Sequence, residues 1–392
     1  MLSPAHSEQK ANTVAFAFLL IAFLTGIASS FQMPTLSLFL SQEINVSPFM
    51  VGLFYSFNSV MGIVLSQILA RYSDKLDDRR KIVIICCIIA AFGCLIFAYN
   101  RNYYVLAFLG TFLLGVGAAA NPQSFALARE YAESSGRETV MFTTIMRTQI
   151  SLAWIVGPPL SFSIALSWGF DYMYLVATLA FLLCAAISAA LLPKIKMRPR
   201  PQNNDKIDDK QIDKKSVFYL FMACFLIMGS NGMYLINMPL YVIHELNLPE
   251  RLAGILMGTA AGMEIPIMLI AGYLTKYYHK KTLIFTALLA GLLFYLCLPW
   301  ATKTWQLISL QLLNAIIIGI VATIGMVYFQ DLMPTQMGSA TTLFSNAAKS
   351  SWIVSGPLTG IIAEHWHYGT VFYVSVGVLI LATICFVKVK SA

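Results

Sequence analysis

The sequence predicts an all-α integral membrane protein with twelve transmembrane helices in two pseudo-symmetric six-helix bundles. Three observations lead to this prediction: the composition, the lengths of the apolar runs, and landmarks of the first half that recur in the second. The mean hydropathy is +0.73 and 11% of the 392 residues are charged, whereas about a quarter are charged in a soluble domain. This composition excludes a soluble protein of this length.

The apolar runs are long enough to cross a ~30 Å hydrocarbon core, which takes about 20 helical residues. We expect spans near residues 14–40, 49–71, 82–99, 103–127, 138–166, 172–192, 217–243, 250–274, 282–298, 305–330, 339–363 and 370–387. They give an N-terminal bundle (1–192), a charged cytoplasmic linker (193–216) and a C-terminal bundle (217–392). Because the other loops are short, neighbouring spans are expected to pack antiparallel.

Several landmarks occur at corresponding places in the two halves. Gln-Met-Pro at 32–34 matches Asn-Met-Pro at 237–239, and Trp154 before Gly-Pro at 157–158 matches Trp352 before Gly-Pro at 356–357. A duplicated six-span unit is typical of secondary transporters, in which two similar bundles move about a central site. The repeat therefore favours a transporter.

The distribution of basic residues predicts the orientation. With the N-terminus in the cytoplasm, the outside loops carry only Arg101, Arg251 and Lys303 of the 26 Lys and Arg residues. Basic residues concentrate in cytoplasmic loops, so both termini are expected in the cytoplasm. The net charge of +8 is thus an orientation signal, and we expect no nucleic-acid partner.

The sequence contains no sign of an enzyme or of a metal site. All seven cysteines lie in expected spans, and the five histidines lie in loops or near the N-terminus. No nucleophile–base pair, phosphate-binding loop or Cys/His metal spacing is present. We therefore expect no catalytic residues, no metal and no cofactor.

Three ionisable residues lie well inside spans: Arg147, Glu264 and Lys349. Each such charge costs roughly 2.5–3.5 kcal/mol near a helix centre, so it normally faces the bundle interior with a partner. Glu264 is the only acid so placed, and an incompletely paired carboxyl group in a membrane can exchange protons. All three are candidates for proton coupling. A structural ion pair of Glu264 with Lys349 or Arg147 explains the same pattern equally well.

Two spans present a cation and a tryptophan on one helical face. Arg147 and Trp154 are seven residues apart in the fifth span, and a cation and tryptophan, Lys349 and Trp352, also share a face in the eleventh. Such a face suits a cavity that hydrogen-bonds hydroxyl groups while an aromatic plane covers the apolar face of a ring. Helix packing is the alternative role of both tryptophans.

Uncharged amides inside spans form a second set of candidates. They offer hydrogen-bond donors and acceptors without charge, which suits a neutral polyhydroxylated solute. The candidates for substrate binding, with the two tryptophans, are Gln32, Asn58, Asn121, Gln149, Trp154, Asn231, Asn237, Asn314, Asn346 and Trp352. Hydrogen bonding between helices is the alternative explanation for each amide.

The loop after the second span resembles the G-x-L-x-D-R-x-G-R-R signature of the major facilitator superfamily. Asp74 and the pair Arg79 and Arg80 match it, with Ala70 at the glycine position and one extra residue before the arginines. A second copy at 272–281 keeps the glycine and a basic pair but lacks the acid. The resemblance implies a cytoplasmic gate made of Asp74, Arg79 and Arg80; orientation charge alone is the alternative.

Longer blocks resemble the bacterial sugar efflux transporters of that superfamily. They include residues 32–37, 121–123, 151–154, 236–240, 258–266, 311–315 and 329–334. The resemblance implies the major facilitator fold and export of small sugars and glycosides, of the lactose, glucose or thiogalactoside type, across a bacterial inner membrane. It further implies a monomer that exchanges sugar for protons, with the proton gradient as its energy source.

Two other functions remain open at this stage. A multidrug/proton antiporter of the same fold is the main alternative, although it would favour an acid-lined cavity and the first half has no acid deep in its spans. A membrane sensor or scaffold without transport is the third hypothesis. The absence of an appended domain and the presence of both loop copies argue against it.

Overall fold

The structure is a computed structural model that describes residues 4–73, 78–136, 138–194, 213–334 and 337–390. Within these ranges the chain is helical and contains no strand. The helices are α1 (Pro4–Gln42), α2 (Pro48–Ser73), α3 (Arg79–Tyr99), α4 (Tyr103–Val105), α5 (Thr111–Ala118), α6 (Ala120–Ser135), α7 (Thr139–Trp168), α8 (Phe170–Leu191), α9 (Lys214–Leu240), α10 (Arg251–Leu274), α11 (Lys280–Cys297), α12 (Thr304–Ile320), α13 (Met326–Leu332), α14 (Met337–His365) and α15 (Tyr368–Val387). Short turns of π-helix, η1 (Leu106–Gly110), η3 (Tyr241–Glu245) and η5 (Val321–Gly325), join or extend them, and a 3₁₀ turn, η4 (Leu298–Trp300), follows α11.

Eleven helical segments of the described chain are long and apolar enough to span a membrane. The α4–α6 and α12–α13 stretches each count as one span, because η1 and η5 continue the helix. Helix α14 has 29 residues but is not among the eleven, and its middle carries the polar residues Ser345, Asn346 and Lys349. With α14 as the twelfth, the all-helical membrane architecture is confirmed.

The chain divides into two compact units. The first comprises Met1–Phe39 and Val60–Pro201, and the second comprises Leu40–Ser59 and Gln202–Ala392. The beginning of α2 therefore belongs with the second unit. Most of the expected linker, residues 195–212, lies outside the described residues, and the expected bundle limits stay a prediction.

In the first unit, α3 packs along α8 and α5. Phe39, Phe97 and Tyr174 form a buried aromatic cluster with ring centroids 5.1–6.1 Å apart. Helices α1 and α7 approach closely at Gly157, where a Cβ would lie 1.9 Å from Ser30 Oγ. In a membrane the hydrophobic effect does not drive helices together, so they associate through close van der Waals packing. Small residues at such crossings allow that packing.

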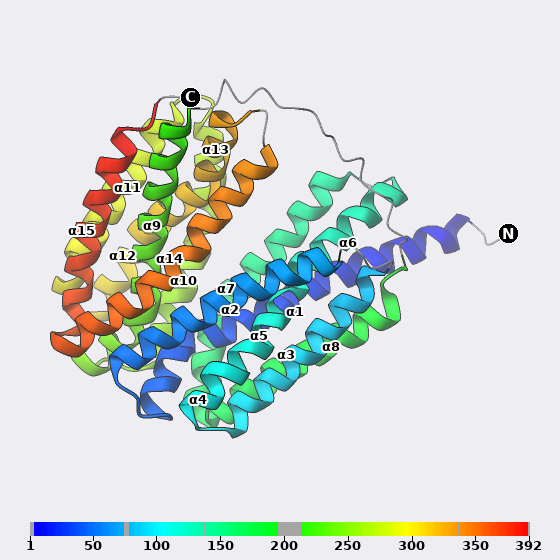
Figure 1. Ribbon diagram of the computed structural model, residues 1–392, viewed down its shortest axis with the longest axis horizontal. Coiled ribbons are helices and arrows are strands. Elements are labelled where there is room, and N and C mark those ends of the chain that lie inside the picture. Colours follow the sequence, from blue (N-terminus) through cyan, green and yellow to red (C-terminus); the bar gives the residue numbers. More distant parts are fainter. Residues whose placement is uncertain (1–3, 74–77, 137, 195–212, 335–336, 391–392) are drawn as a thin grey trace. The chain divides into compact units, whose positions relative to one another are not determined.

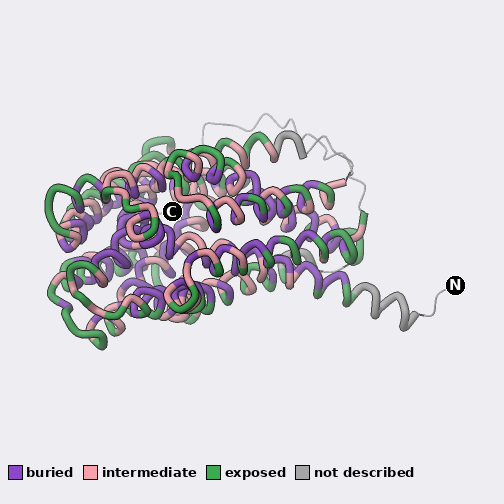
Figure 2. The backbone as a smooth tube through the Cα atoms, turned by 90° about the horizontal axis from the view of Figure 1, so that it is seen from below, coloured by how far each residue is buried: buried purple, intermediate pink, exposed green. Residues whose placement is uncertain are grey.

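In the second unit, α9 lies along α14 and α15 (Figure 1). Tyr234 of α9 packs edge-on against Phe294 of α11, and its hydroxyl donates to Gln311 Oε1 of α12 at 3.0 Å. Exposed residues follow the outward helix faces and the turns, as Figure 2 shows. This distribution fits helices whose outer faces meet lipid.

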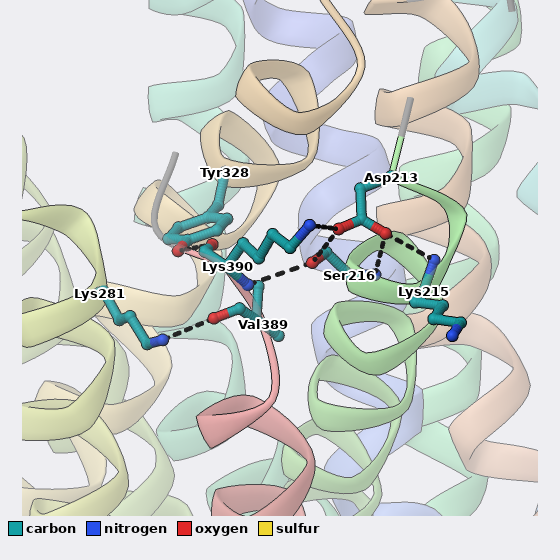
Figure 3. Close-up of polar contacts among 7 residues, drawn as sticks. All are labelled: Asp213, Lys215, Ser216, Lys281, Tyr328, Val389 and Lys390. Atoms are coloured by element: carbon teal, nitrogen blue, oxygen red, sulfur yellow. Dashed lines mark hydrogen bonds and ion pairs between the residues drawn. The ribbon is translucent and has the colours of Figure 1, made fainter. Parts of the chain in front are cut away.

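The C-terminal residues bind back to the start of α9 (Figure 3). Asp213 caps α9 by accepting from the amides of Lys215 and Ser216, and its carboxylate also lies 2.9 Å from Lys390 Nζ. The Lys390 amide donates to Ser216 Oγ, and Tyr328 Oη donates to the Lys390 carbonyl. The tail is therefore fixed to both α9 and α13.

The contribution of Asp213 to stability is expected to disappear in acid. The Lys390 ammonium, helped by the Ser216 amide, lowers the pKa of Asp213 to about 2. A lowered folded-state pKa stabilises above the ordinary Asp value and loses its effect as the pH falls from about 4 to about 2. The thermal midpoint of Asp213→Asn in detergent should lie below the parent's at neutral pH. The gap should close over this range; a gap that persists at about pH 2 would contradict the assignment.

Candidate functional site

The basic pair Arg79 and Arg80 opens α3 and binds two other helices of the first unit. Arg79 Nε lies 2.9 Å from Glu130 Oε1, and its Nη1 donates to Gln123 Oε1 at 2.9 Å; both partners are on α6. Arg80 Nη1 donates to the Ala189 and Leu192 carbonyls at the end of α8. The pair thus joins the start of α3 to α6 and α8, while Asp74, its partner by resemblance, lies outside the described residues.

The second unit repeats both contacts. Lys280 at the start of α11 forms an ion pair with Asp331 of α13, and Lys281 donates to the Val387 and Val389 carbonyls at the end of α15. Each acid follows its basic partner by 51 residues. The second loop copy therefore keeps the helix-joining role of the first although it lacks the acid of the signature.

Removing the Arg79 charge should destabilise the first unit. The Arg79 and Glu130 side chains are 11% and 26% exposed, so Arg79→Gln leaves a largely buried carboxylate without its partner, at a cost of about 3 kcal/mol. Arg129→Gln is the matched control, because its Glu133 partner is on the same helix and both side chains are 57% exposed; its cost should stay below about 0.5 kcal/mol. Thermal midpoints in detergent measure both. Equal shifts for the two variants would refute the importance of the Arg79 pair.

Glu264 lies in the middle of α10 and is half-buried. It makes no side-chain hydrogen bond or ion pair with any described residue, Lys349 of the same unit included. Lys349 itself is exposed on α14. The ion pair of Glu264 with Lys349 is therefore not present in this conformation, and a role of Glu264 in proton coupling stays a prediction.

Helix α7 of the first unit carries three of the predicted site residues, Arg147, Gln149 and Trp154. Ser30 Oγ of α1 donates to the Ala153 carbonyl at 3.1 Å, so Ala153 and Gly157 face α1. Arg147 is exposed, while Gln149 and Trp154 are half-buried. Arg147 and Trp154, seven residues apart, can offer a cation and an indole from one face, whereas Gln149 lies on the other side of the helix.

The eleventh-span tryptophan is packed differently from its counterpart. Trp352 stacks on Tyr55, with ring centroids 5.9 Å apart and planes inclined by 25°. The Cβ position of Gly232 on α9 lies 3.6 Å from the same indole. In this conformation the Trp352 ring is therefore packed against α2 and α9, whereas the Trp154 ring makes no aromatic contact with a described residue.

Helices α2 and α14 meet backbone to backbone beside this stack, within the second unit. A Cβ on Gly52 would lie 2.1 Å from the Gly356 carbonyl oxygen, and one on Gly360 would lie 2.5 Å from that of Pro48. Ser56 Oγ donates to the Ile353 carbonyl at 2.6 Å, and the Phe49 amide donates to Glu364 at 2.9 Å. Gly356 and Gly360 therefore allow the close approach of α14 to α2.

The amide candidates separate into two groups. Asn237 and Asn314 are buried: Asn237 donates to the Tyr368 carbonyl and Asn314 to Gln311 Oε1. Gln32, Asn58, Asn121 and Asn231 are half-buried, and Asn346 is exposed. The second group is better placed to meet a solute in this conformation, and substrate binding by any of these residues stays a prediction.

Comparison with known proteins places this architecture in a family. The Major Facilitator Superfamily model matches residues 18–356 and 220–391. The chain is 52% identical to sugar efflux transporter A of Dickeya chrysanthemi, over 96% of this chain and 95% of the relative. It is 47% identical to sugar efflux transporter B of Salmonella typhimurium, over 99% of both, and 46% identical to sugar efflux transporter C of Escherichia coli, over 96% of both.

Solved structures support the fold. The nucleoside transporter NupG superposes with a TM-score of 0.79 over 96% of this chain and 100% of its own, at 15% identity. A bacterial homologue of the lysosomal transporter Spinster, inward-facing and unoccupied, gives 0.72 over 96% of both chains at 12% identity. At such identities the likeness concerns the fold alone. From the full-length matches, the chain belongs to the bacterial sugar efflux transporter family of the major facilitator superfamily.

Proposed function

We propose that the chain exports small sugars and glycosides, of the lactose, glucose or thiogalactoside type, by alternating access in exchange for protons. The full-length relatives named as sugar efflux transporters support sugar as the cargo. The observation that carries proton exchange is Glu264, a half-buried acid in a span with no ion pair or hydrogen bond to a described residue. A carboxyl group in that setting can gain and lose a proton as its surroundings change.

The proposal includes the orientation and the energy source. The chain lies in a bacterial inner membrane with both termini on the cytoplasmic side, in keeping with the few basic residues in the loops on the outer side. The proton gradient drives transport without a cofactor, and one chain is the working unit. Arg147 and Lys349 are exposed, and because charges avoid lipid, we assign both to an aqueous pathway.

Uptake of labelled lactose by everted vesicles tests the function, because an exporter carries its substrate into their lumen. Such vesicles should accumulate lactose when a proton gradient is present and release it when a protonophore removes that gradient. Vesicles without the protein provide the background. Gradient-dependent movement of ethidium without movement of lactose, glucose or a thiogalactoside would instead establish a multidrug antiporter.

A further inference from the structure

The last turn of α10 and the turn that follows it carry an exposed group of two tyrosines and a lysine, here called the tyrosine–lysine cluster: Tyr273, Lys276 and Tyr277. The two phenol oxygens lie 3.0 Å apart, and the rings pack with centroids 5.4 Å apart. Lys276 Nζ lies 5.5 Å from the centre of the Tyr273 ring. Both tyrosines are more than half exposed, so the cluster faces its surroundings.

The cluster offers hydrogen-bond donors and an uncompensated positive charge. In the phenol pair one O–H donates to the other oxygen, which leaves the second O–H free to donate outward. A tyrosine hydroxyl keeps its proton at neutral pH because its ordinary pKa is about 10, and the bond with Tyr273 raises the pKa of Tyr277 further. Lys276 has no carboxylate partner among the described residues, in contrast to Lys280, which pairs with Asp331.

An apolar surface continues from the cluster along α10. Leu269 is 72% exposed and lies one turn before Tyr273 on the same helical face, and its neighbour Ile270 is 55% exposed. Because α10 is a membrane span, this surface meets acyl chains. Tyrosine and lysine at the end of a span are the side chains that lie at the level of lipid headgroups.

The two loop copies differ in charge. Residues 71–81 contain three acids, Asp74, Asp77 and Asp78, beside five basic residues, whereas residues 272–281 contain three lysines and no acid. An anionic headgroup therefore meets no like charge within the second loop. A zwitterionic headgroup would find no carboxylate in the second loop for its ammonium group.

We propose that the tyrosine–lysine cluster binds the phosphate of an anionic phospholipid whose acyl chains lie along Leu269 and Ile270. Lys276 supplies the charge, and the Tyr273–Tyr277 pair donates to a phosphate oxygen. The bound lipid thereby contacts the turn that Lys280 and Lys281 tie to α13 and α15. The proposal does not depend on which solute the chain transports.

Lipid-dependent stabilisation of the purified full chain tests the proposal. Phosphatidylglycerol added to the detergent should raise the thermal midpoint more than phosphatidylcholine does. Lys276→Gln should weaken half-saturation by phosphatidylglycerol by about fivefold, as expected for ~1 kcal/mol per basic contact at an anionic surface. Tyr277→Phe should weaken it by a similar factor through the loss of one hydrogen bond. Both variants should leave the midpoint in phosphatidylcholine unchanged. Lys215→Gln and Tyr278→Phe, which alter an exposed lysine and tyrosine outside the cluster, are the matched controls.

Two results would overturn the proposal. One is the same phosphatidylglycerol response in parent, Lys276→Gln and Tyr277→Phe. The other is an equal rise in midpoint with inorganic phosphate at the same concentration, which would identify a general anion site. A response weakened in both cluster variants, kept in both controls and absent with free phosphate establishes lipid binding.

Discussion

Glu264→Gln is expected to abolish gradient-driven sugar export while leaving exchange of labelled for unlabelled sugar intact. Glutamine keeps the size and hydrogen-bonding capacity of the side chain but cannot carry a proton. In exchange the carrier moves sugar in both directions and needs no change in protonation, so this activity should remain at the parent rate. Uphill accumulation in everted vesicles should fall to that of vesicles lacking the protein.

The control for this variant is Glu133→Gln. Glu133 is exposed at the end of α6, where its one described ion pair, with Arg129, is equally exposed. The Glu133→Gln variant should therefore transport sugar at the parent rate both in uphill accumulation and in exchange. If Glu264→Gln retains uphill accumulation, Glu264 is a structural residue; if it loses exchange as well, the side chain is needed for sugar binding or folding rather than for coupling alone.

The sequence predicted the fold because the signals for it are local. Most spans are long and predominantly apolar runs, and the duplication is visible from matched short motifs such as Gln-Met-Pro and Asn-Met-Pro. The partner of Arg79 was not predicted, because the signature lies in one loop and Glu130 lies on a helix 51 residues further on. The same spacing separates Lys280 from Asp331, and a comparison of acids at equal offsets in the two halves could have found both pairs.

The surroundings of the candidate site residues could not be predicted, because helical periodicity says which residues share a face but not what that face meets. Trp154 and Trp352 occupy matched positions in sequence, yet Trp352 stacks on Tyr55, nearly three hundred residues away. Asn237 and Asn314 looked the same as Asn346 in the sequence, but the first two are enclosed by their own unit and the third is exposed. Burial of this kind depends on which helices pack together, which no single span encodes.

The α2–α14 contact leads to the second large expected effect: Gly52→Ala should destabilise the protein and reduce transport. The added Cβ would lie 2.1 Å from the Gly356 carbonyl oxygen, and a backbone oxygen can move away only if the helices separate. Separation removes the Ser56 hydrogen bond to Ile353 and the Tyr55–Trp352 stack. Overpacking of this kind costs about 1–3 kcal/mol, which exceeds the ~1 kcal/mol that alanine gains over glycine inside a helix.

Gly62→Ala on the same helix is the matched control for Gly52→Ala. Nothing lies within 4 Å of its Cβ position, so only the gain in helix propensity applies and its thermal midpoint should equal or exceed the parent's. Opposite shifts for two glycine-to-alanine changes ten residues apart would separate the effect of close packing from that of helix propensity. Should Gly52→Ala match Gly62→Ala in both midpoint and sugar export, the backbone contact between α2 and α14 is not needed for either stability or transport.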